Sequence, residues 1–107
     1  MKNTSNILKN IVPVYILYTI IDNKREMSEV LNEIKSNFAK VNDSYIYSEI
    51  GKLTNKEFIE SFFDIKEDLP KKYIKITDKG KERFYSLKED LNVIFLVLEK
   101  IQTKISI

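Results

Sequence analysis

Hydrophobic residues recur along the chain with two different spacings. In residues 6–22, 28–39 and 44–54 they lie three and four positions apart, which predicts three helices, each with one buried face. Ser28 is the predicted N-cap of the second helix. In residues 72–76 the isoleucines alternate with polar or aromatic residues, and residues 58–66 hold three phenylalanines and two isoleucines, a composition typical of strands. The polar, proline-containing residues 67–71 between them predict a turn, so the two strands should form a hairpin.

The third predicted helix has a narrow apolar stripe, formed by Ile46, Ile50 and Leu53. The positions expected to face outward are Tyr45, Ser48, Glu49 and Lys52. Gly51 within this helix costs about 1 kcal/mol of helix propensity relative to Ala. Close packing against another helix would explain the glycine.

A long helix is predicted from Thr77, whose hydroxyl can cap the first turn, to near the end of the sequence. Its apolar residues alternate at spacings of three and four, as in the seam of a coiled coil. These seam residues are Phe84, Leu87, Leu91, Ile94, Leu98, Ile101 and Ile105. Residues 93–98 are apolar on every side, so we expect the helix to pair with its copy in a homodimer. The alternative is a helix packed only against its own domain.

The order of these elements predicts an α+β fold that is mainly α: a winged helix-turn-helix. Three helices and a two-stranded wing would form a DNA-binding domain over residues 1–76. Residues 77–107 would form a long C-terminal dimerisation helix. In this fold the third helix is the one that enters the major groove.

Two segments resemble PadR-like transcriptional regulators. Residues 46–59, IYSEIGKLTNKEFI, are similar to the family pattern L-Y-x-x-L-x-x-L-x-x-x-G-[LY]-[IV], with Tyr47 on its tyrosine. Residues 73–82 are similar to its Y-x-[IL]-T-x-x-G-x-x pattern, and the resemblance extends over about residues 10–105. Glu57 stands where the family usually has glycine, and residues 23–27 replace a glycine-rich approach to the second helix. The resemblance implies a winged-helix protein that binds double-stranded DNA.

Composition excludes most catalytic chemistry. The 107 residues include no histidine and no cysteine, which removes the usual zinc ligands, thiol nucleophiles and imidazole bases. The acidic pairs at residues 67–68 and 89–90 are best interpreted as a turn and a solvated helix face. We therefore expect no enzyme, no cofactor and no metal site. Residues 11–21, the longest apolar stretch, are too few to span a membrane and contain Pro13, so a cytoplasmic protein is expected.

Polar residues in and before the third helix are the first candidates for DNA contact. They are Asn42, Ser44, Tyr45, Tyr47, Ser48 and Lys52, with a place in the core as the alternative for Tyr47. Residues 42–54 carry two carboxylates against one lysine and no arginine, an unusual balance for a surface that lies against phosphates.

Positive charge is concentrated further along the chain, where residues 71–83 hold six basic residues and two acidic ones. We therefore expect a basic wing in which Lys71, Lys72 and Lys75 bind DNA. Lys71 and Lys72 would form the wing tip and enter a minor groove. The alternative is a set of lysines on an ordinary solvated surface.

These features favour a dimeric transcriptional regulator that binds a specific site. A second hypothesis is an accessory DNA-binding factor of a plasmid or phage, serving conjugative transfer, replication or partition. A third is a protein-interaction module that uses the apolar seam. The sequence gives no indication of a small-molecule effector.

Overall fold

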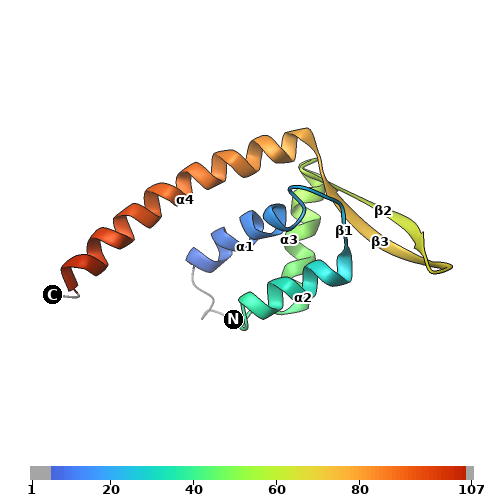
Figure 1. Cartoon of the computed structure of the whole chain (residues 1–107), viewed down its shortest axis with the longest axis horizontal. Coiled ribbons are helices and arrows are strands. Elements are labelled where there is room, and N and C mark those ends of the chain that lie inside the picture. Colours follow the sequence, from blue (N-terminus) through green and yellow to red (C-terminus); the bar gives the residue numbers. More distant parts are fainter. Residues whose placement is uncertain (1–5, 106–107) are drawn as a thin grey trace.

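The computed structural model describes residues 6–105, with residues 6–10 described only in their helical backbone. Three helices gather at the centre, while the hairpin and the last helix extend in opposite directions (Figure 1). The elements are α1 (Asn6–Thr19), β1 (Arg25–Glu26), α2 (Met27–Asn37), α3 (Asp43–Asn55), β2 (Ile59–Lys66), β3 (Leu69–Ile76) and α4 (Asp78–Ile105). The predicted fold, mainly helical with a wing and a long last helix, is confirmed.

The hydrophobic core is built around α1. Val12, Ile16 and Leu17 of this helix, and Ile20 directly after it, are at most 1% exposed. The side chains that surround them come from every other layer of the fold: Val30 and Ile34 of α2, Ile46 and Ile50 of α3, Ile59 of β2 and Ile74 of β3. Because α1 contributes to contacts with α2, α3 and α4, it sets the relative positions of the helices.

The sheet has three antiparallel strands in the order β1-β3-β2. The sequence did not predict β1, because two residues are too few to show an alternating pattern. Its residues pair with β3, Arg25 opposite Ile74 and Glu26 opposite Tyr73. This pairing places the start of α2 beside the wing.

The turn of the wing is shorter than predicted. Only Glu67 and Asp68 connect the strands, with φ angles of 55° and 65°, and Pro70 already lies in β3. Two residues with positive φ form the tight turn that matches the twist of a hairpin. Lys71 and Lys72 are therefore opposite Asp64 and Phe63 within the strands, and their prediction as the wing tip is wrong.

Hydrogen bonds cap both the end of α3 and the start of α4. The amides of Glu57 and Phe58 donate to the carbonyls of Thr54 and Leu53, 2.9 Å each, which closes α3 with Glu57 at a φ of 65°. The Thr77 hydroxyl oxygen accepts from the Gly80 amide at 2.9 Å, so the predicted cap of α4 is confirmed.

The two glycines have opposite surroundings. A Cβ atom on Gly51 would meet nothing within 4 Å, so the expectation that this glycine packs closely against another helix is wrong. A Cβ atom on Gly80 would overlap the carbonyl oxygen of Phe58 and lie 2.8 Å from Ile76 Cγ1. Close packing therefore explains the second glycine and leaves the first without a structural reason.

The N-cap of α2 lies two residues earlier than predicted. Ser28 was expected as the N-cap, but Glu26 takes this position in a capping box with Glu29. The Ser28 hydroxyl donates to Glu26 Oε2 at 2.7 Å.

Candidate nucleic-acid interface

The outer face of α3 is polar and carries no ionised side chain. Exposed residues along it lie three and four positions apart, opposite the buried stripe of Ile46, Ile50 and Leu53. They are Ser44, Tyr47, Ser48, Gly51 and Asn55. The sequence prediction missed Gly51 and Asn55 on this face, although helical spacing from Ser48 points to both.

Both acidic residues of α3 are withdrawn from that face. The side chain of Glu49, predicted to face outward, is only 10% exposed and lies 3.2 Å from Lys52 Nζ. The prediction failed because Glu49 lies three positions after Ile46 and four before Leu53, so the buried stripe is wider than its apolar members. Asp43 pairs with Lys35 of α2 at 3.0 Å. The local excess of acid seen in the sequence therefore does not appear on the outer face.

Three other predicted contact residues of this region have structural roles. Asn42 caps α3, its Oδ1 accepting from the Tyr45 amide at 2.8 Å. Tyr45 packs partly buried against the core, and burial, together with the nearby Glu49, raises the pKa of its hydroxyl. Lys52 Nζ lies 3.2 Å from Glu49 Oε2, and the Lys52 side chain is 65% exposed. Asn42 and Lys52 are exposed and remain candidates for DNA contact, although Lys52 also pairs with Glu49, whereas Tyr45 is half-buried.

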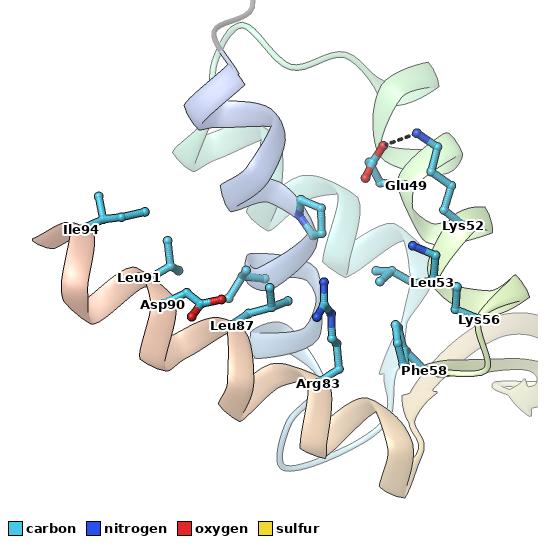
Figure 2. A pocket seen from close by; sticks show the side chains of 12 residues that line it. Glu49, Lys52, Leu53, Lys56, Phe58, Arg83, Leu87, Asp90, Leu91 and Ile94 are labelled. Atoms are coloured by element: carbon cyan, nitrogen blue, oxygen red, sulfur yellow. Dashed lines mark hydrogen bonds and ion pairs between the residues drawn. The ribbon is translucent and has the colours of Figure 1, made fainter.

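A cavity of about 370 Å³ lies on the inner side of α3, between that helix, α1 and α4 (Figure 2). Apolar side chains such as Leu53 and Leu87 line it together with charged ones from two helices. The charged residues are Glu49, Lys52, Lys56, Arg83 and Asp90. Lys52 and Lys56 thus belong to this inner surface.

A second cleft, of about 420 Å³, brings together three of the predicted DNA-binding residues. Tyr47 of α3 and Lys71 and Lys72 of β3 line it, together with Pro70, Glu26 of β1 and the first residues of α2. Tyr47 is 51% exposed, so the alternative that it is a core aromatic is wrong. Ser28, predicted only as the N-cap of α2, also lines this cleft.

The wing as a folded hairpin is electrically balanced. Residues 59–76 hold four lysines and four carboxylates, because β2 and the turn supply acids that lie opposite or beside the lysines of β3. Lys75 Nζ is 3.6 Å from Glu60 Oε1, and Lys66 is 4.0 Å from Glu26. The expected basic wing is therefore not basic as a whole, because the excess of lysines counted over residues 71–83 is offset within the hairpin by the acids of β2 and the turn. Within residues 6–105, Lys71 and Lys72 have no ion-pair partner.

Lys24 connects one face of the wing to the loop after α1. Its ammonium group lies 3.0 Å from Asp64 Oδ2 and 5.5 and 5.2 Å from the ring centres of Phe62 and Tyr73. These two rings stack across the strands with centres 5.9 Å apart. The hydrogen bond from Lys24 lowers the pKa of Asp64. Stacking and cation–π contact hold the hairpin at one angle to the helices.

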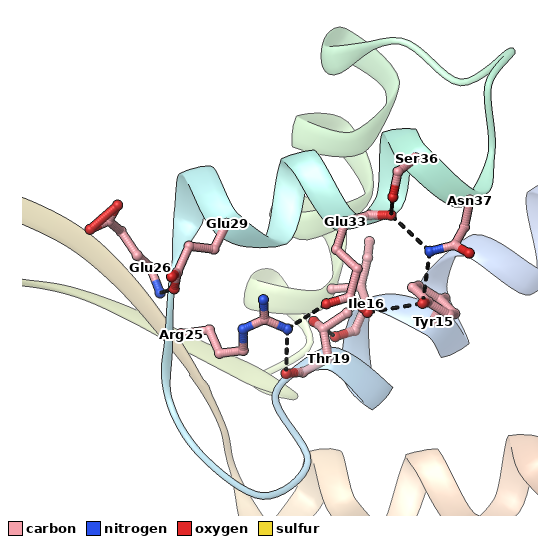
Figure 3. A network of polar contacts seen from close by, with 9 residues as sticks. All are labelled: Tyr15, Ile16, Thr19, Arg25, Glu26, Glu29, Glu33, Ser36 and Asn37. Carbon is pink, nitrogen blue, oxygen red and sulfur yellow. Dashed lines mark hydrogen bonds and ion pairs between the residues drawn. The ribbon is translucent and has the colours of Figure 1, made fainter.

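A polar network fixes α2 against α1 (Figure 3). Glu33 accepts hydrogen bonds from Arg25 Nη1 at 2.6 Å and from the Tyr15 hydroxyl at 2.9 Å, and Asn37 donates to the Tyr15 oxygen at 3.0 Å. The hydrogen bond from Arg25 is the main cause of a lowered pKa at Glu33, while burial raises the pKa of Tyr15. The network sets the position of α2, and hence one wall of the cleft.

The apolar seam of α4 divides into two parts. Phe84 is buried in the core of its own chain, and Leu87 and Leu91 are partly buried against it. From Ile94 onward the seam is exposed, with Ile94, Leu98 and Ile101 between 47 and 49% accessible. In residues 93–98 the neighbours of the seam are exposed as well, namely Val93, Phe95, Leu96 and Val97.

Comparison with known proteins places this arrangement in a family. A family model described as a winged helix DNA-binding domain matches residues 16–95, about three quarters of the sequence. The chain belongs to the winged helix DNA-binding domain family. No curated protein matches it significantly. Membership in a family of DNA-binding domains agrees with the expectation that this winged-helix chain is not an enzyme.

Solved structures share the fold of this winged-helix chain. A PadR-like transcriptional regulator from Bacillus cereus has a TM-score of 0.83 at 23% identity, covering 92% of this chain and 97% of that one. A PadR family transcription regulator from Clostridium difficile has a TM-score of 0.76 at 15% identity, with coverages of 85% and 97%. A transcriptional regulator from Clostridium thermocellum has a TM-score of 0.75 at 20% identity, with coverages of 90% and 97%. The predicted resemblance to PadR-like proteins is confirmed at the level of the fold.

Within residues 6–105, no helix has the length and apolar character needed to cross a membrane.

Proposed function

We propose that this winged-helix chain is a transcriptional regulator that binds a specific double-stranded DNA site as a homodimer. The single observation that carries the DNA-binding part is the uncharged outer face of α3, next to a cleft with two lysines. Both acids of α3 form ion pairs away from that face, so the helix can approach phosphates without repulsion.

The two parts of this surface have different tasks. Ser44, Tyr47 and Ser48 of α3 face the bases and backbone of the major groove. Lys71 and Lys72, which flank the cleft beside Tyr47, neutralise phosphates at the edge of that groove. Lys75 is excluded from this set because its ammonium group is held near Glu60. The acidic turn at Glu67 and Asp68 disfavours entry of the wing tip into a minor groove.

The dimer rests on the second half of α4. A helix that is apolar on every side over residues 93–98 is not stable in water without a partner, and its own domain does not cover it. A second copy supplies an identical apolar helix, and two such helices pair about a twofold axis. The two α3 helices of such a dimer would contact the two halves of a pseudo-palindrome.

Selection from a random double-stranded DNA pool tests the DNA-binding part. Enrichment of a site with twofold symmetry is expected, and titration of salt should weaken binding to it. Failure to enrich any sequence, together with no binding to random duplexes at low salt, would contradict the proposal and favour a protein-interaction module.

Sedimentation velocity tests the dimer. The double variant Leu98→Glu/Ile101→Glu should sediment as a monomer, since it places four carboxylates in the proposed interface. The matched control Asn92→Glu/Gln102→Glu adds the same charge at polar exposed positions of α4 and should remain a dimer. A monomeric wild type, or a dimer unaffected by the seam variant, would show that α4 does not dimerise the chain.

A further inference from the structure

Gly51 occupies the middle of α3 although nothing in the fold requires a glycine there. Glycine is among the least favourable residues in a helix interior. Its φ is negative, as in any α-helix, and a Cβ atom would meet no heavy atom within 4 Å. Alanine would therefore fit both the backbone conformation and the space, and would make the helix more stable.

The position of Gly51 gives a reason for its lack of a side chain. It lies at the centre of the outer face of α3, three residues after Ser48, four after Tyr47 and four before Asn55. The flanking side chains are polar, and the centre of the face is bare backbone. Glycine is commonly used where a ligand approaches the main chain closely.

We propose that Gly51 is the point of closest approach between α3 and DNA, where base edges in the major groove pack against its Cα atom. Any side chain at this position would hold the helix away from the groove and weaken the contacts of Tyr47 and Ser48 on either side. The inference rests on the proposed function, because it takes α3 as the helix that faces DNA. It makes Gly51 a specificity-determining residue whose role is to be small.

Binding and stability measured on the same variants separate this role from a structural one. The variants are Gly51→Ala, Gly51→Lys and, as a control, Ser86→Ala at an exposed position of α4. Affinity is measured by fluorescence anisotropy at fixed salt, on the DNA site selected with the wild-type protein. Thermal unfolding is followed by circular dichroism.

Gly51→Ala should unfold at a temperature about 4–8 °C above the wild type, the shift expected for a gain in helix propensity in a domain of this size. Its Kd should nevertheless rise about tenfold, the loss expected when one good base contact is removed. Gly51→Lys should also bind more weakly despite its added positive charge. Ser86→Ala should leave the Kd unchanged.

Three results would overturn the inference. Unchanged affinity of Gly51→Ala, or tighter binding by Gly51→Lys, would show that the position has room for a side chain in the complex. A lower unfolding temperature for Gly51→Ala would show that the glycine serves the fold. In each case the wild type binds DNA and the proposed function stands. If the wild type binds no DNA, both proposals fail together, which is a distinguishable outcome.

Discussion

The hydroxyl of Thr77 donates a hydrogen bond of 2.6 Å to the carbonyl oxygen of Glu57. The same oxygen atom of Thr77 caps the first turn of α4 by accepting from the Gly80 amide. One side chain therefore joins the end of the helix proposed to read DNA to the start of the helix proposed to form the dimer. The distance between the two surfaces is set here, where α3, the wing and α4 meet.

Glu57 is strained at this junction, so Glu57→Gly should stabilise the protein. A non-glycine residue with a φ of 65° costs about 1 kcal/mol relative to glycine. The free energy of unfolding in urea should rise by about that amount, with an unchanged m-value. Glu60→Gly, a carboxylate to glycine change in a strand, is the control and should destabilise. No gain for Glu57→Gly would mean that its side chain compensates the strain.

Gly80→Ala should destabilise the protein, in contrast to alanine at Gly51. The added methyl group would overlap the carbonyl oxygen of Phe58, which cannot move without breaking its hydrogen bond from the Thr77 amide at 3.1 Å. Overpacking of this kind costs about 1–3 kcal/mol. Chemical denaturation measures the loss, and a variant as stable as the wild type would show that α4 can shift away from the wing.

Lys71 and Lys72 should contribute more to DNA affinity than Lys75. The double variant Lys71→Ala/Lys72→Ala removes two ammonium groups that have no carboxylate partner among the described residues. It should weaken binding and, because the proposed dimer loses four ammonium groups, reduce the dependence of log K on log salt by about 4. Lys75→Ala, the matched control from the same strand, removes a charge already near Glu60 and should change the slope little. A larger loss for Lys75→Ala would contradict this assignment.

Lys52 should contribute less to DNA affinity than Lys71 and Lys72. Lys52 faces Glu49 on the inner side of α3, so Lys52→Ala should affect DNA affinity less than the Lys71→Ala/Lys72→Ala pair. Anisotropy titrations at one salt concentration make the comparison. If Lys52→Ala causes the greater loss, the inner surface of α3 takes part in binding.

Stability should fall in acid partly through Glu33. Hydrogen bonds from Arg25 and Tyr15 lower its pKa in the folded state, so its contribution is present above the pKa of the unfolded chain and disappears as pH falls through the folded pKa. Glu33→Gln should therefore reduce the slope of unfolding free energy against pH below about pH 4.5. Asp64→Asn, at an exposed ion pair, is the control and should have a smaller effect. An unaltered slope for Glu33→Gln would contradict a role for the network in acid stability.

Local patterns of the sequence were sufficient to predict most of the helices and strands of this protein. Apolar spacing predicted all four helices and the second wing strand, because a helix or strand with one buried face leaves that period in its residues. The phenylalanines and isoleucines of residues 58–66 predicted the first wing strand by composition. The Thr77 cap and the buried stripe of Ile46, Ile50 and Leu53 followed from the same local rules. The motif of residues 77–80 predicted where β3 ends and α4 begins. It did not predict the contact between Gly80 and the Phe58 carbonyl oxygen that requires a glycine.

The tertiary structure decided where the charges lie and which glycine is packed. Lysines and carboxylates far apart in sequence become neighbours only through strand register, so a balanced wing looks basic when residues 71–83 are counted alone. Glu49 faces inward because its helix packs against α1, which no count of charges along α3 reveals. The surroundings of Gly51 and Gly80 depend likewise on which elements meet them. The spacing of apolar residues is a local property that can be observed in the sequence. Contacts between residues of different elements form only when those elements pack together.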